Sequence, residues 1–197
     1  ISSGLHAQSL KFEPTMKKVL AEMDSAKTTM DFQNISAKFE RIGDAEKTQW
    51  LPYYYAALAL TTPAWTDQSI DKDQNAEKIN AIIAKAEAIQ KNAELYSLKY
   101  MSATQQLLVD PQQRFMTYGM QLHNFMTEGL SLEPNNPRLL FLKGSSEFNT
   151  PEQFGGGKKV AKETLQKAIS AYDAEIPQPL YPHWGRERAQ ELLEACD

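Results

Sequence analysis

The chain alternates between stripes of hydrophobic residues at helical spacing and polar stretches that are rich in good helix formers. Phe32, Ile35 and Phe39 recur at intervals of three and four residues, which places them on one side of a helix. The sequence nowhere sustains the two-residue alternation of a half-buried strand. The pattern therefore predicts an all-α protein.

These stripes, with the residues that start and stop helices, predict nine helices. Their ranges are 13–27, 31–43, 49–62, 74–91, 93–108, 112–132, 138–148, 156–175 and 183–196. Asp110-Pro111 and Asn136-Pro137 each combine an N-cap residue with a first-turn proline. The helices pair as four antiparallel hairpins followed by a last helix. No hairpin can bury its stripe alone, so we expect them to stack in a single domain over 11–197.

The segment from Glu128 to Pro137, with the sequence EGLSLEPNNP, resembles the boundary between two tetratricopeptide repeats. That family ends a helix with a small residue, Leu, an acidic residue, Pro and Asn, and places a small residue in the next helix, where Gly144 stands. Ala161 and Ala168 match the small positions of the following helix. The hairpins start about 36 to 45 residues apart, longer than the family's usual repeat of about 34. The resemblance implies an α-α superhelix with a concave binding face.

The resemblance also implies a protein or peptide partner on that concave face. The family's groove positions fall on Arg138, Phe141, Ser145 and Phe148, and on Tyr55 in the second hairpin. A cation, a hydroxyl and aromatic rings suit a peptide carboxylate or an apolar anchor. The leading hypothesis is a non-enzymatic module that binds a protein or a peptide.

An alternative hypothesis rests on the aromatic residues Trp50, Tyr53–Tyr55 and Trp65. Neighbours on a helix are about 100° apart, so at least one of the three tyrosines is expected to face a groove or solvent. Exposed Trp and Tyr rings can hold a small molecule or a glycan. Trp65 or Tyr55 as an exposed platform would favour this alternative.

Composition and charge exclude several classes of protein. The chain has 197 residues and a net charge of -4, which offers no overall attraction to nucleic-acid phosphates. A single cysteine and three histidines without metal-ligand spacing predict no metal and no cofactor. The glycines and lysines of 154–159 depart from a phosphate-binding loop and predict a flexible loop. Because no nucleophile–base pair is evident, we expect no catalysis.

The first residues give an expectation about location. Ile1 to Ala7 end in a small residue after an apolar stretch, like the tail of a secretory signal peptide. We therefore expect residues 1–10 to be a residual signal peptide or a flexible arm. The protein is expected to be exported, to the periplasm or the cell envelope.

Overall fold

The computed structural model describes residues 10–197, and the regular structure of those residues is entirely helical. The α-helices are α1 (Phe12–Ser25), α2 (Thr29–Glu46), α3 (Leu51–Thr61), α4 (Lys72–Ile89), α5 (Ala93–Leu107), α6 (Pro111–Leu132), α7 (Pro137–Asn149), α8 (Lys158–Ala174) and α9 (Arg186–Glu194). Two 3₁₀ turns are η1 (Pro63–Trp65) and η2 (Glu152–Phe154). The predicted all-α class is confirmed. Residues 1–9, which hold most of the expected signal-peptide remnant or arm, lie outside the described residues.

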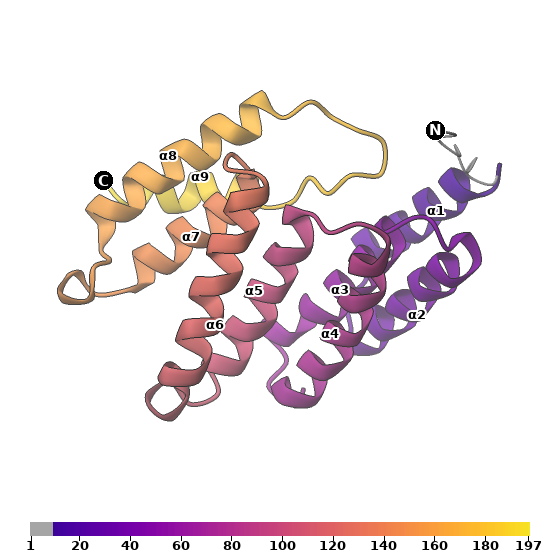
Figure 1. Cartoon of the computed structure of the whole chain (residues 1–197), viewed down its shortest axis with the longest axis horizontal. Coiled ribbons are helices and arrows are strands. Elements are labelled where there is room, and N and C mark those ends of the chain that lie inside the picture. The colour runs from indigo at the N-terminus through magenta and orange to yellow at the C-terminus, as the bar shows by residue number, and fades with distance from the viewer. Residues whose placement is uncertain (1–9) are drawn as a thin grey trace. The chain divides into compact units, whose positions relative to one another are not determined.

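The described residues group into two compact units. The sequence pattern predicts a single domain. The first unit comprises residues up to Lys91 together with Ser102–Arg114. The second comprises Asn92–Met101 and Phe115–Asp197, so α5 and α6 contribute to both. Within the first unit α1 packs on α2, α2 on α3 and α3 on α4; within the second, α7 packs on α8 and α8 on α9 (Figure 1). The tetratricopeptide-like superhelix remains a prediction.

Helix α3 is buried on all sides of its axis in the first unit. Tyr53, Tyr54 and Tyr55 are all 5% exposed or less. The ring of Tyr55 stacks on Phe39 with centroids 5.4 Å apart and meets Tyr54 edge to face at 5.2 Å. The expectation that one tyrosine faces a groove or solvent is wrong, because α2 and α4 both pack against α3. A helix that is apolar all round belongs in a core.

The predicted helix starts are built from side-chain caps. Asn136 accepts the backbone N–H of Leu139 at 3.0 Å, and Pro137 occupies the first turn of α7. Asp110 accepts the backbone N–H of Gln113 at 3.2 Å at the start of α6. Each bond satisfies an amide that has no partner within its own helix, which makes these helix boundaries readable in the sequence.

In the core of the second unit, glycines stand where two helices pack closely against each other. A Cβ on Gly144 would lie 2.7 Å from Cγ of Leu165 on α8, and one on Gly129 would lie 2.6 Å from Cδ1 of Leu139 on α7. Ala161, like Leu165, is fully buried in the same core. The predicted role of these small residues in close packing is confirmed.

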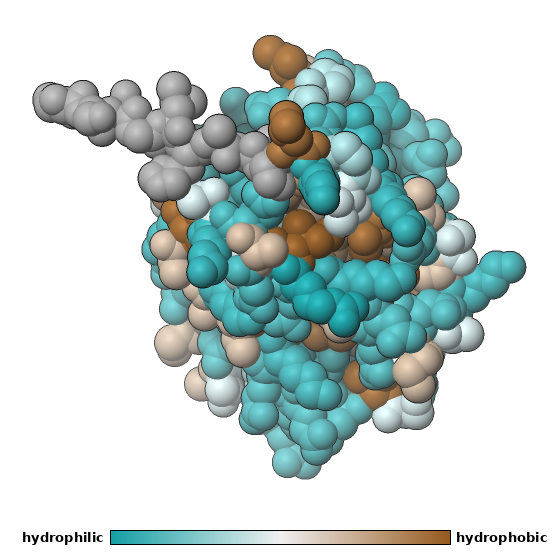
Figure 2. Space-filling view, turned by 90° about the vertical axis from the view of Figure 1, so that its right-hand side faces the viewer, coloured by the Kyte–Doolittle hydropathy of each residue, from teal (hydrophilic) through white to brown (hydrophobic). Residues whose placement is uncertain are grey.

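Amphipathic helices that pack through their apolar stripes turn polar residues to the surface. The face drawn in Figure 2 is largely hydrophilic, and its hydrophobic residues appear in small groups. Between residues 10 and 197, no helix has both the length and the apolar character that crossing a bilayer would take.

Candidate functional site

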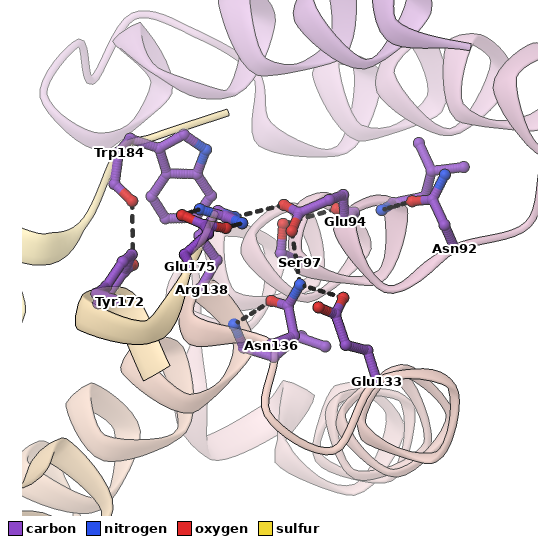
Figure 3. Close-up of polar contacts among 11 residues, drawn as sticks. Asn92, Glu94, Ser97, Glu133, Asn136, Arg138, Tyr172, Glu175 and Trp184 are labelled. Carbon is purple, nitrogen blue, oxygen red and sulfur yellow. Dashed lines mark hydrogen bonds and ion pairs between the residues drawn. The ribbon is translucent and has the colours of Figure 1, made fainter. Parts of the chain in front are cut away.

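The side chain of Arg138 lies inside the second unit, at the centre of a polar network (Figure 3). Its Nε donates to Oε2 of Glu94 at 2.6 Å, and its terminal amines pair with the carboxylate of Glu175. The exposed fraction is 2% for the side chain of Arg138 and 7% for that of Glu94. The guanidinium predicted to grip a partner is thus engaged within the fold and is not offered at the surface.

Asn136 extends this network to the start of α7. Its Nδ2 donates to Oε1 of Glu94 at 2.6 Å and to Oε2 of Glu133 at 2.9 Å. Burial raises the pKa of the Glu94 carboxyl, while Arg138 and Asn136 act to lower it. The network joins α5, α7 and the end of α8 through satisfied hydrogen bonds, so it is a structural feature of the second unit.

Of the other predicted contact residues, two are buried and two are half-buried. Phe141 is 9% exposed, and its ring meets Trp184 at a centroid distance of 6.4 Å. Phe148 is half-buried against the same core, and Ser145 is half-buried on α7. Tyr55 is buried and belongs to the first unit. A groove that includes Ser145 and Phe148 remains a prediction.

The aromatic platform that would favour a small ligand is only partly present. Trp65 is 40% exposed at the end of η1, whereas Tyr55 is 4% exposed. Of these two residues only Trp65 is accessible to a ligand.

The loop of three consecutive glycines does not present its amides to a phosphate. The backbone N–H of Gly155 donates to Glu152, that of Gly156 to Pro151 and that of Gly157 to Glu147. Gly155 and Gly157 also have positive φ values, of 84° and 99°. The glycines close the turn that precedes α8, and their amides are used within it.

No group of three or more His, Cys, Asp or Glu side chains in the described part of the chain could hold a metal ion. His123 on α6 and His183 before α9 are both exposed, and His6 lies outside the described residues.

Helix α6 carries an exposed apolar surface. Of its 22 residues only Gly129 is fully buried. Phe115, Met116 and Met120 are 64%, 79% and 66% exposed. Met116 and Met120 lie about 40° apart around the helix axis and Phe115 about 100° from Met116, and we call these three residues the α6 apolar face. Large apolar side chains gathered on one exposed helix mark a binding surface more often than isolated ones do.

Contacts at both ends hold α6 in place. At its start, Arg114 forms two hydrogen bonds with the carboxylate of Asp73 on α4, at 2.8 and 2.9 Å, and one with the carbonyl of Gln106 at 3.0 Å. Near its end, Tyr96 on α5 donates to Oε2 of Glu128 at 2.6 Å. The first contacts lie within the first unit and the last within the second. Within the second unit, the contact with Tyr96 ties the end of α6 to α5.

The same helix lacks acidic side chains along most of its length. Residues 111–127 contain no Asp and no Glu, and the charge of Arg114 is balanced by Asp73. The polar side chains between the apolar ones are amides and hydroxyls, with the imidazole of His123 one turn after Met120. Residues 111–127 thus combine adaptable thioethers and aromatic rings, and contribute no carboxylate that would repel an anion.

The sequence interpretation did not identify the α6 apolar face. The sequence feature that indicates this surface is the pair Met116 and Met120, which are four residues apart in a segment without acidic residues. Met126, on the same helix, is instead half-buried against the cluster of Ala93, Tyr96 and Leu139. Only the packed structure separates the two sides of this helix.

Comparison with solved structures finds that the chain is similar to the HusA haemophore from Porphyromonas gingivalis. The two chains share 33% sequence identity with a TM-score of 0.86, over 96% of this chain and 94% of that one. No protein-family model and no curated protein matches the chain. A haemophore is a haem carrier, so this relative is a binding protein and not an enzyme.

Proposed function

The chain belongs to the family of the HusA haemophore, and on that basis we propose that it binds haem or a related porphyrin. The identity of 33% over almost the full length of both chains is the observation that carries this proposal. It favours the small-molecule alternative over a protein or peptide partner. The proposed role is capture and transport of the ligand, without catalysis.

We place the ligand on the α6 apolar face. A porphyrin is a flat, largely apolar ring system, and haem adds two carboxylates at one edge. Phe115 can stack on such a ring, and the thioethers of Met116 and Met120 can adapt to its surface. Because residues 111–127 carry no acidic side chain, the carboxylates of the ligand meet no like charge on this part of α6.

The side chains on this helix also include groups that bind haem iron in other proteins. Thioethers and imidazoles both serve as axial ligands, and Met116, Met120 and His123 follow at spacings of four and three residues. The proposed surface therefore fits haem as well as a porphyrin without metal.

Titration of the purified protein with haem, followed by the absorption of the porphyrin, tests this proposal. The double variant Met116→Ser/Met120→Ser removes two exposed apolar side chains and leaves the cores of both units intact. We expect its affinity for haem to fall about tenfold or more, because burying one such side chain contributes about 1.5–3 kcal/mol.

Met30→Ser is the matched control, since Met30 is 64% exposed on α2, away from the proposed surface in the sequence. It should bind haem like the wild type. A wild-type chain that binds no porphyrin would overturn the proposed function. Equal affinity of the wild type and the α6 double variant would remove the ligand from this face.

The location proposed for this function is the cell envelope or the exterior of the cell. The relative is a haemophore, which is consistent with the export predicted from residues 1–7. Fractionation of cells that express the natural gene tests this location, and recovery in the cytoplasm alone would contradict it.

A further inference from the structure

All seven methionines lie in the part of the chain that the structure describes, and their surroundings differ sharply. Met16 and Met101 are 0% and 8% exposed, and Met23 and Met126 are half-buried. Met116 and Met120, at 79% and 66%, stand on neighbouring turns of α6. Side chains four residues apart on a helix have their Cβ atoms about 6 Å apart, so the two thioethers form one continuous patch.

We propose that Met116 and Met120 form an oxidation site that controls ligand binding on the α6 apolar face. This inference rests on the proposed function, because it concerns the same surface. Exposed methionines are the more readily oxidised ones, and Met116 and Met120, with Met30, are the most exposed methionines.

The chemistry needs only an oxidant of the peroxide class. A lone pair on the thioether sulfur attacks one peroxide oxygen, an S–O bond forms and the O–O bond breaks. The second oxygen leaves as water after proton transfer, so the sulfur is oxidised by two electrons and the peroxide is reduced. The product is a sulfoxide, which methionine sulfoxide reductases convert back to the thioether.

Oxidation replaces an apolar contact with a strongly polar one at the centre of the proposed surface. A flat apolar ligand offers no hydrogen-bond donor to two sulfoxide oxygens, so binding would strip them of water without compensation. We expect the affinity for haem to fall about tenfold or more when both residues are oxidised. Helix α6 itself should persist, because neither side chain belongs to a core.

The test oxidises the ligand-free protein with hydrogen peroxide, removes the peroxide with catalase and then titrates haem. Mass spectrometry of peptides gives the sulfoxide content at each methionine. Affinity should fall in step with oxidation of Met116 and Met120, and treatment with methionine sulfoxide reductases should restore it. A protein that is fully oxidised at both positions and binds haem unchanged would overturn the inference.

Two variants sharpen the result. Met116→Leu/Met120→Leu keeps the apolar surface without sulfur and should bind haem equally before and after peroxide. Met30→Leu removes the other highly exposed methionine, and its affinity for haem should still fall after peroxide treatment. A leucine variant that loses affinity after peroxide as the wild type does would refute the site. Failure of the untreated wild type to bind haem would instead refute the proposed function.

Discussion

Arg138 on α7 and Glu94 on α5 form an ion pair inside the second unit, with Nε of the guanidinium 2.6 Å from Oε2 of the carboxylate. The two residues are 44 positions apart in the sequence. Glu175 pairs with the same guanidinium, and Asn136 donates to the other oxygen of Glu94. A side chain whose type and position suggest a peptide-binding cation is instead a structural link between three helices.

Removing this cation should destabilise the protein strongly. Arg138→Ala leaves the buried carboxylate of Glu94 without its charged partner, and breaking such a pair typically costs about 3–5 kcal/mol. Urea denaturation followed by circular dichroism measures the change in the free energy of unfolding. Arg188→Ala is the control, because its pair with Glu191 is more than 60% exposed on both sides and should contribute little. Equal stability of the two variants would contradict the structural role.

A methyl group on Gly129 should disrupt the packing of α6 on its neighbours. The added Cβ would lie 2.6 Å from Cδ1 of Leu139 and 2.8 Å from Cβ of Tyr96. Gly129→Ala is therefore expected to lower the free energy of unfolding by about 1–3 kcal/mol. Gly119→Ala on the same helix meets nothing closer than 3.5 Å and should stabilise α6 by about 0.5–1 kcal/mol. Thermal unfolding of the two variants should move in opposite directions.

The turn before α8 should tolerate substitution at one glycine better than at another. Gly157 has a φ of 99°, and its Cβ would lie 2.4 Å from Cγ of Glu152, whereas Gly155 has a φ of 84° with open space around it. Gly157→Ala should lower the free energy of unfolding by about 1–3 kcal/mol. Gly155→Ala adds no steric clash and should lower it by about 1–2 kcal/mol, through backbone strain alone. Chemical denaturation of both variants tests this order of stability. A phosphate-binding role for the loop would not predict such an order.

Acid should weaken the first unit through Asp67. Hydrogen bonds from the hydroxyls of Ser69 and Thr29, and from the amide of Ser69, lower the pKa of Asp67 to about 2. Because the pKa is lower in the folded chain, this stabilisation is present above the unfolded value of 3.8 and is lost as the pH falls towards 2.

Unfolding measured between pH 6 and pH 2 checks this dependence. Asp67→Asn should be less stable than the wild type at neutral pH, and the difference should shrink as the pH approaches 2. A difference between Asp67→Asn and the wild type that stays constant down to pH 2 would contradict the prediction.

The family relationship and the sequence interpretation agree on the helical class and on a binding role, and differ on the ligand. The tetratricopeptide-like motif rests on small residues such as Gly144 and on the chain reversal at Pro134. Close packing of helices demands these features whatever the surface binds. A motif made of packing residues carries little information about a ligand.

The sequence by itself determined which segments are helices and where they begin. The periodic stripes and caps such as Asn136 act within a few residues, so their effect can be read locally. The tertiary structure alone decided which apolar and charged side chains remain accessible. Tyr55 and Arg138 are buried because helices distant in the sequence pack over them, whereas Met116 and Met120 stay exposed on α6. Burial depends on neighbours that the local pattern does not specify, and so the candidate binding surface came from the fold.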